Sequence, residues 1–332
     1  MNRLKKKHTS ETSDNKIANK DTTQTISCLI ALATLVVLFS ILSPYFLSAE
    51  NLFTVMIQTV TTALLGFGMT YVIISGAIDL SLSSMLAVSS VIVASLLKAG
   101  YSILVCCMGA LGCALILGYI NGLLITKLTL PAFVATIGTQ MAIRGLALVF
   151  TDSRAVYISN RPEYRILAQG RLLGMQYPVY IMLVIAIVAT FILRKTVIGR
   201  HIYAIGSNEE AARLSGISVH GVRIFAYMFS ATMASVAGII TTARVNSGQP
   251  GIAVGYEAYA VAASVIGGVS MSGGHGKIFG TLLGAIIIGV LTNGLNLIGV
   301  STQWQQVATG VTLAISVYLD IIRQKRRMGA VK

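Results

Sequence analysis

Long apolar runs separated by short polar breaks occupy nearly the whole chain. Ten of these runs are close to the length of a membrane-crossing helix, because about 20 apolar residues span a bilayer. None has the two-residue alternation of a barrel strand, so helices are predicted. The third and eighth runs are short enough to be half-buried or broken helices. The predicted spans are residues 27–43, 52–74, 82–97, 101–126, 131–150, 177–194, 222–243, 257–271, 278–299 and 304–322.

Composition agrees with this pattern. Hydrophobic residues make up 55% of the 332 residues and charged residues only 11%, whereas a soluble domain carries about 25% charged residues. The sequence therefore predicts an all-α, polytopic transmembrane bundle of about ten helices. Its expected divisions are a disordered basic tail over residues 1–26, a transmembrane domain over 27–325 and a basic tail over 326–332.

The basic charge is placed asymmetrically along the chain. The net charge is +14, which is compatible with nucleic-acid binding, but the positions of the charges favour another explanation. With the N-terminus inside, 18 Lys and Arg residues fall in cytoplasmic segments and five on the opposite side. This is the positive-inside rule. It predicts that both termini are cytoplasmic and that nucleic acid is not a partner.

Motifs for covalent chemistry and for metal binding are absent from the sequence. The four cysteines form no CxxC pair and the four histidines lie at unrelated spacings, so no catalytic or metal site is predicted. Gly276 and Lys277 resemble the end of a phosphate-binding loop. However, Met271 stands where the first Gly is required, and Ile278 follows the Lys. We expect this chain to be no enzyme and to bind no cofactor itself.

Two breaks between spans are rich in small residues, 75–84 and 267–280. Irregular backbone at membrane depth survives only where protein or a water-filled cavity surrounds it. Transporters often place such interruptions at related points of two structural halves. Both breaks therefore indicate a pathway and suggest an internal repeat. In the first break, Asp79 could cap the next helix or line the pathway, and the two roles are compatible.

Other polar residues lie inside the predicted spans. Amides in a helix bundle more often bond neighbouring helices than touch substrate, so Gln140, Arg144 and Gln303 are left as helix-bonding groups. The predicted pathway residues are Asp79, Ser81, Asn121, Glu257, Gly273, Gly274, Asn293 and Asn296. The break over 151–177, on the opposite side from the termini, is either a docking surface for a soluble partner or a solvated loop.

The segment 206-GSNEEAARLSGIS-218 is a short charged stretch between two apolar runs. Ser207 and Glu210 have the spacing of a capping box. Two acids suit the first turn of a helix, and Gly216 can take the left-handed position after its end. These signals predict a helix over residues 208–215, which is too short to be stable alone in water.

The predicted short helix carries a small apolar ridge made by Ala211, Leu214 and Ile217. Such a ridge among charges suits insertion into a groove on another protein. The alternative is a helix on the lipid surface, but two acids would repel an anionic leaflet. A cytoplasmic partner is therefore expected.

These segments resemble the permease subunits of ATP-binding-cassette sugar importers of the ribose-permease type. The resemblance covers residues 27–325 in order. It is carried by 43-SPYFLSAENLF-53, 66-GFGMTYVIISGAIDLSLSS-84, 131-PAFVATIGT-139, 203-YAIGSNEEAARLSGISV-219, 243-ARVNSGQP-250, 256-YEAYAVAASVIGGVSMSGGHGKIFGTLLGA-285 and 293-NGLNLIGV-300.

The resemblance implies a type II importer fold in the bacterial inner membrane. It also implies three partners: a second permease copy, a cytoplasmic ATPase that holds ATP and Mg²⁺, and an extracytoplasmic sugar-binding protein. The coupling loop over 195–221 would contact the ATPase. The coupling residues expected there are Asn208, Glu209, Glu210, Ala211, Ala212, Arg213, Leu214, Gly216 and Ile217.

The predicted function is translocation of a monosaccharide, ribose or a related sugar, delivered by the binding protein. The chain departs from the family at Ser83, where Gly is usual, and at Tyr259, where Asp is usual, so the particular sugar stays open. The alternative is an ion-coupled secondary sugar transporter. That class needs acidic sites at mid-membrane, for which Asp79 and Glu257 are the candidates.

Overall fold

A computed structural model describes residues 25–158 and 161–329. The predicted N-terminal tail lies outside this range, except that its last two residues begin a helix, Thr25–Leu42. The helices that follow are α2 (Ala49–Ile74), α3 (Leu82–Lys98), α4 (Ile103–Thr126), α5 (Ala132–Phe150), α6 (Pro162–Gln169), α7 (Tyr177–Lys195), α8 (Val197–Ser207), α9 (Glu209–Leu214), α10 (Val219–Val245), α11 (Tyr256–Ile266), α12 (Ile278–Leu297) and α13 (Thr302–Gly329). The strands are β1 (Val156–Tyr157), β2 (Arg171–Leu172), β3 (Met175–Gln176) and β4 (Ser247–Gly248).

A helix occupies each predicted span, which confirms an all-α polytopic membrane protein. Within the described residues, seven helices are long and apolar enough to cross a membrane, while α3 and α11 are shorter. The eighth predicted span ran to residue 271, whereas α11 ends at Ile266. Helix α13 continues to Gly329, so residues 326–329 of the predicted C-terminal tail are helical. The last three residues of that tail lie outside the described residues.

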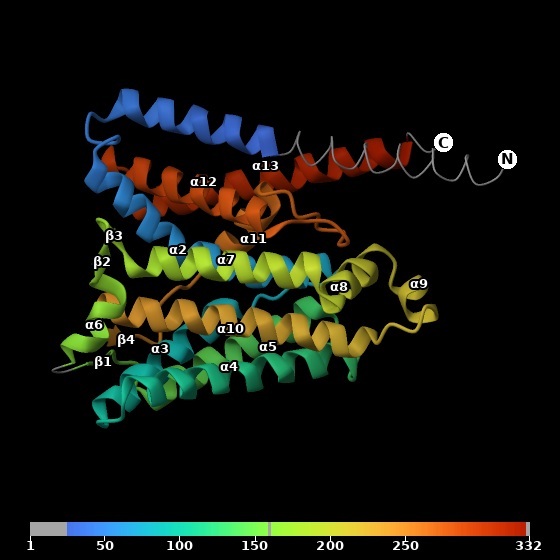
Figure 1. The fold of residues 1–332 in the computed structure, drawn as a ribbon, viewed down its shortest axis with the longest axis horizontal. Coiled ribbons are helices and arrows are strands. Elements are labelled where there is room, and N and C mark those ends of the chain that lie inside the picture. The colour runs from blue at the N-terminus through green and yellow to red at the C-terminus, as the bar shows by residue number, and fades with distance from the viewer. Residues whose placement is uncertain (1–24, 159–160, 330–332) are drawn as a thin grey trace.

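The helices form two packed groups (Figure 1). Each group takes its long helix from the other half of the sequence. In sequence, α2 precedes the short α3, and then α4 and α5; likewise α10 precedes the short α11, and then α12 and α13. In space, however, α10 packs against α3 and α4, and α2 packs against α11 and α12. Because α2 ends and α10 begins near α8, the two long helices run in opposite directions. This is the pattern of an inverted repeat.

The contact between α4 and α10 shows why the helices approach so closely. Gly118 and Gly122 are four residues apart on α4, the spacing that lets two membrane helices bring their backbones together. A β-carbon on Gly118 would lie 2.7 Å from the carbonyl oxygen of Tyr227, and one on Gly122 would lie 2.8 Å from the Cα of Ile224. Any larger residue at either position would push the two helices apart.

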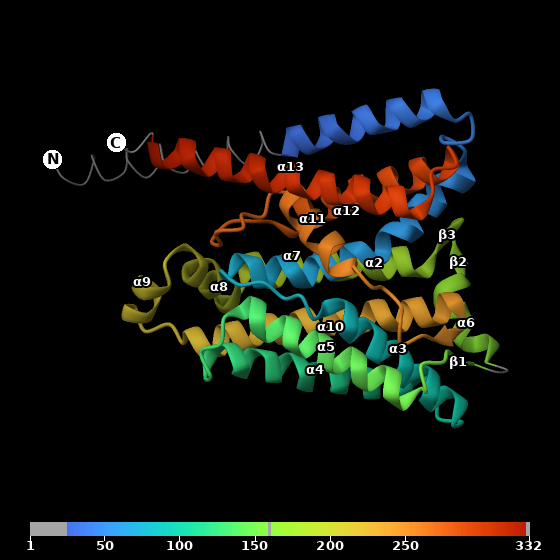
Figure 2. The ribbon, with the colours of Figure 1, turned by 180° about the vertical axis from the view of Figure 1, so that it is seen from behind.

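The two ends of the bundle differ (Figures 1 and 2). Helices α8 and α9 lie at one end, toward which α13 runs, and we call this the α9 end. At the opposite end, the α6 end, β1 pairs with β4 and β2 pairs with β3. The Tyr164 hydroxyl of α6 donates to the Ile239 carbonyl at 2.7 Å. The break over 151–177 is therefore a folded cap on α10.

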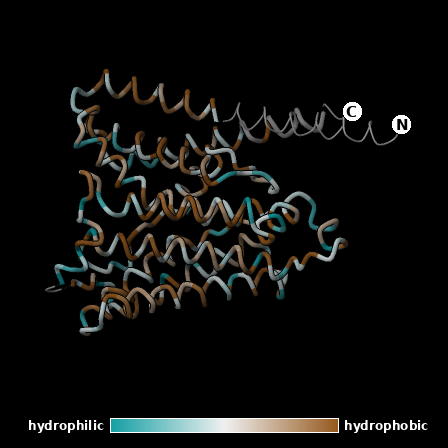
Figure 3. Tube along the Cα trace, in the orientation of Figure 1, coloured by the Kyte–Doolittle hydropathy of each residue, from teal (hydrophilic) through white to brown (hydrophobic). Residues whose placement is uncertain are grey.

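Polar residues gather at these two ends. In Figure 3 the hydrophilic colour concentrates in the connections at both ends, and the helices between them are mostly hydrophobic. Large apolar side chains are exposed along the outer faces of several helices, for example Leu104 on α4, Met141 on α5 and Ile187 on α7. Such faces suit contact with lipid, since a bilayer is the apolar solvent of a spanning helix.

Candidate functional site

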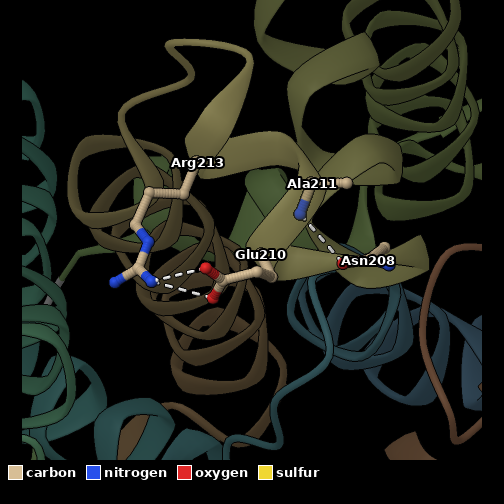
Figure 4. Close-up of polar contacts among 4 residues, drawn as sticks. All are labelled: Asn208, Glu210, Ala211 and Arg213. Carbon is tan, nitrogen blue, oxygen red and sulfur yellow. Dashed lines mark hydrogen bonds and ion pairs between the residues drawn. The ribbon is translucent and has the colours of Figure 1, made fainter.

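Helices α8 and α9 form a projection at the α9 end, which we call the coupling knob. Its cap differs from the predicted capping box. Ser207 is the last residue of α8, and Asn208 is the N-cap of α9, with its Oδ1 accepting from the Ala211 N–H at 2.9 Å (Figure 4). The prediction of a Ser207–Glu210 box is therefore wrong, because α8 runs directly up to Asn208 and takes Ser207 into its last turn.

The charges of α9 make two ion pairs. Glu210 and Arg213 pair with each other at 2.8 Å on the exposed surface, as Figure 4 shows. Hydrogen bonding to Glu210 raises the pKa of the Arg213 guanidinium. Glu209 instead accepts from Arg223 of α10 at 2.6 Å. The exposed pair within α9 contributes little to stability, whereas the Glu209–Arg223 pair joins α9 to the start of α10.

The end of α9 and its apolar side chains only partly match the prediction. Gly216 has φ +81°, which confirms it as the left-handed residue after the helix. Ala212 is buried, and Ile217 packs against the bundle core, so Ile217 is no part of an exposed ridge. Leu214, in contrast, is 80% exposed. The knob therefore presents one protruding leucine among charges.

The coupling knob touches both predicted breaks through a cluster of glycines, Gly76, Gly206, Gly273 and Gly274, which we call the glycine junction. A β-carbon on Gly206 would collide with the Ile74 carbonyl, and one on Gly273 would lie 3.1 Å from the Cα of Gly76. Gly273 also has φ +83°, which L-residues rarely adopt. Both positions therefore require glycine.

Two hydrogen bonds hold this junction together. The Gly274 N–H donates to the Ile74 carbonyl at 2.9 Å, which joins the second break to the end of α2. The Tyr203 hydroxyl of α8 donates to the Gly276 carbonyl at 2.7 Å. The knob is thus bonded to the segment between α11 and α12. Helix α8 also packs at Gly206 against the end of α2, where the first break begins.

Three predicted pathway residues meet at the start of α3. Asp79 is fully buried, and its Oδ1 accepts from the Ser81 N–H at 3.0 Å and from the Ser81 hydroxyl at 2.5 Å. Its Oδ2 accepts from the Ser230 hydroxyl of α10 at 2.7 Å. Asn121 of α4 donates to the Ser81 hydroxyl at 2.9 Å. Asp79 therefore satisfies an N–H at the helix start, although the N-cap itself is Ser81.

A second polar group, the central cluster, lies where α3, α5 and α11 meet. Gln140 of α5 donates to Ser83 at 3.2 Å and to Glu257 at 3.1 Å. Arg144, one turn further, donates to the carbonyls of Pro250 and Ile252, both at 3.0 Å. Within the described residues, Glu257 Oε2 is buried without a hydrogen-bond partner. Sequence reasoning placed Glu257 in the pathway but left Gln140 and Arg144 as helix-bonding groups.

The last two predicted pathway residues lie on α12 and differ in role. Asn293 exchanges two amide hydrogen bonds with Asn51 of α2, at 2.9 and 3.0 Å, so it bonds neighbouring helices. Asn296 accepts from Gln305 at 2.8 Å and lines a cavity of about 340 Å³. We call this space the outer cavity, because its walls from α12 and α13 belong to the half of the bundle nearer the α6 end.

The outer cavity was missed by sequence reasoning, apart from Asn296 and the family departure at Tyr259. Its walls come from segments spread over nearly 250 residues of chain, so no local pattern marks it. They contain Gln58, Thr61, Thr62, Arg244, Val254, Tyr256, Tyr259, Ile288, Gly289, Thr292, Asn296, Thr302, Gln305 and Gln306. Two long helices of opposite direction, two short helices behind irregular segments and a polar interior are typical of membrane transport permeases.

The chain matches, over residues 51–317, the family described as branched-chain amino acid transport system / permease component. It belongs to this permease family and is a multi-pass protein of the inner membrane. It is 40% identical over 299 residues to the ribose import permease protein RbsC of Escherichia coli (strain K12), covering 89% of this chain and 93% of that protein.

Two further relatives are similar over comparable lengths. RbsC of Bacillus subtilis (strain 168) is 40% identical over 298 residues, which cover 90% of this chain and 92% of that protein. The D-allose transport system permease protein AlsC of Escherichia coli (strain K12) is 36% identical over 296 residues, 89% of this chain and 90% of that protein. No solved structure matches the chain.

Proposed function

We propose that this chain is the translocation subunit of an importer for a monosaccharide, driven by a separate cytoplasmic ATPase and supplied by an extracytoplasmic sugar-binding protein. The sugar class is supported by the relatives, which are named as ribose and allose permeases. An ion-coupled secondary transporter is not favoured, because the chain belongs to a family of transport-system permease components.

The observation that carries the coupling proposal is the glycine junction. The coupling knob presents Leu214 to its surroundings, and its other side touches both breaks at Gly76 and Gly273. An ATPase that binds the knob differently in its nucleotide states would therefore bias the positions of α2, α11 and α12. Such differential contact is what a conformational shift requires.

The proposed assembly contains two copies of this chain. Helices α5, α3, α11 and α13 pack in that order and lie toward the viewer in Figure 2. Gly138 and Gly145 on α5 and Gly310 on α13 have open space around them, so another backbone could approach this face closely. The central cluster of each copy would then border a shared pathway.

The proposed topology has ten membrane segments, of which α3 and α11 enter from irregular segments, and both termini in the cytoplasm. Cysteine labelling of intact cells tests it in a variant without native cysteines. Ser215→Cys on the knob should be protected, and Leu173→Cys at the α6 end should react with an impermeant reagent. Labelling at 215 from outside would reverse the orientation.

The coupling proposal is tested with Leu214→Asp. A charge on the leucine that inserts into the partner costs desolvation without a counter-charge, so the ATPase should no longer co-purify. The matched control is Leu173→Asp, since Leu173 is 91% exposed at the opposite end. It should keep the ATPase. If Leu214→Asp retains both the ATPase and hydrolysis stimulated by the loaded binding protein, the knob is not the coupling element.

A further inference from the structure

The outer cavity has the chemistry of a binding site for a small neutral polyol. Hydroxyl and amide side chains, which each both donate and accept hydrogen bonds, form most of its wall. Arg244 is its one charged lining residue, and no carboxylate lines it. Its volume of about 340 Å³ lies at the small end of the range for ligand pockets, about 300–1,000 Å³.

One wall of the cavity is aromatic. The rings of Tyr256 and Tyr259 stand 5.3 Å apart at 87°, and both side chains face the cavity from the first turn of α11. Tyrosine offers an apolar ring face with a polar tip. A sugar ring has C–H faces and a hydroxyl rim, so it can use the ring surface and the surrounding amides together.

Among the described residues, one lining residue has a fully buried polar atom without a hydrogen-bond partner. Gln58 of α2 lines the cavity, and its Oε1 is buried and unbonded among the described residues. A buried acceptor left unpaired costs free energy. Gln58 as a residue is only partly buried, so rotation of its amide would bring this acceptor within reach of a hydroxyl in the cavity. Another lining amide is already positioned, because buried Gln305 donates to both Asn296 and the Val300 carbonyl.

These observations favour a neutral sugar over the other ligand classes that such a cavity could take. No carboxylate among the lining residues could pair with the ammonium group of a zwitterionic amino acid. A cation lacks a charged ligand for the same reason. A lipid tail needs an apolar wall, which Val254 and Ile288 alone do not provide.

We propose that the outer cavity is a monosaccharide-binding subsite within the permease itself. This inference rests on the proposed function. The sugar is held by Gln58, the α11 tyrosines and the amides of α12 and α13. The first turn of α11 also carries Glu257, which bonds to Gln140 in the central cluster. A sugar bound here therefore contacts the same turn that borders the inner part of the bundle.

The test is equilibrium binding of radiolabelled D-ribose to the purified permease in detergent, without ATPase or binding protein. We expect weak but saturable binding, with D-allose competing and L-leucine not competing. Gln58→Leu should raise the Kd about threefold to tenfold, the loss of one hydrogen bond. This variant should fold, because it removes an unpaired polar atom. Gln303→Leu is the control: Gln303 is exposed on α13 outside the cavity wall.

The outcomes separate the two proposals. Absence of saturable binding means that the cavity holds only water, and equal binding by Gln58→Leu and Gln303→Leu means that ribose binds elsewhere; either result overturns the subsite. The coupling proposal would still stand, since Leu214→Asp tests it independently. Competition by L-leucine would overturn the sugar class for both. Saturable ribose binding together with an unaffected ATPase in Leu214→Asp would keep the subsite and overturn the coupling.

Discussion

Two irregular segments occupy related places in the repeat, residues 75–81 before α3 and residues 249–255 before α11, but they are held differently. The first is fixed by buried neighbours. Asp79 accepts three hydrogen bonds, and the Tyr227 hydroxyl donates to the Ile78 carbonyl at 2.9 Å. Further bonds join the segment to α2, whose carbonyls accept from the N–H groups of Ser75, Gly76 and Ala77.

The second segment is held by a side chain that reaches across from another helix. Half-buried Arg144 of α5 binds the carbonyls of Pro250 and Ile252. Ala253 and Gly255 have positive φ angles, 59° and 86°, and Gly255 has open space around it. A segment with few buried contacts opens at low free-energy cost. The comparison indicates that the segment before α3, residues 75–81, is held rigidly. The segment before α11, residues 249–255, is the one that can move.

The largest effect is expected from Asp79→Ala. It leaves the Ser81 N–H and two buried hydroxyls without their acceptor, which should lower the free energy of unfolding by about 3–5 kcal/mol. Thermal unfolding in detergent measures this. Asp79→Asn keeps the shape and most of the acceptors, so it should lose less than half as much. If both variants melt like the wild type, residues 75–81 are not held rigidly by Asp79.

An intermediate effect is expected from Arg144→Ala. Two carbonyls of residues 249–255 lose their donor, at a cost of about 2–3 kcal/mol. Arg144→Lys should restore only part of it, since an ammonium cannot match the guanidinium fork. Hydrogen exchange distinguishes the two segments: amides of 249–255 should exchange faster in Arg144→Ala, and those of 75–81 should not. Equal acceleration in both would remove the distinction.

The smallest effect is expected from Glu257→Gln. The new amide keeps an oxygen for Gln140, and the atom that replaces Oε2 had no partner to lose. The change in the free energy of unfolding should stay within about 0.5 kcal/mol, measured by the same thermal assay. A loss of unfolding free energy as large as that of Asp79→Ala would mean that the Glu257 charge holds the segment before α11. That segment would then be as rigid as the segment before α3.

Hydropathy predicted the helices well because each span buries a continuous apolar run. It missed α8, because no turn signal separates α8 from α9. Asn208 is both the C-cap of α8 and the N-cap of α9. It also paired the wrong breaks. Residues 267–277 precede the full-length α12. The counterpart of 75–81 is 249–255, which the sequence analysis left between two spans but did not assign to the pathway or the repeat.

The site was predictable where its signal is local. Asp79, Ser81 and Gly216 stand out within a few neighbouring residues. Arg144 bonds to a carbonyl 108 residues away, and Gln140 to a carboxylate 117 residues away, so only folding reveals those partners. Ser83 and Tyr259, the two departures from the family pattern, prove to lie in the central cluster and in the wall of the outer cavity.

The exchange of α2 and α10 between the two groups has a consequence for biogenesis. Most of α2 is buried, largely against α11 and α12, as in the 2.6 Å contact between the hydroxyls of Thr70 and Thr281. Those partners are synthesised some 200 residues later. During translation the polar face of α2 therefore enters the membrane without its final neighbours. The nascent protein has to wait, assembled only in part, until the ribosome has delivered almost the entire chain.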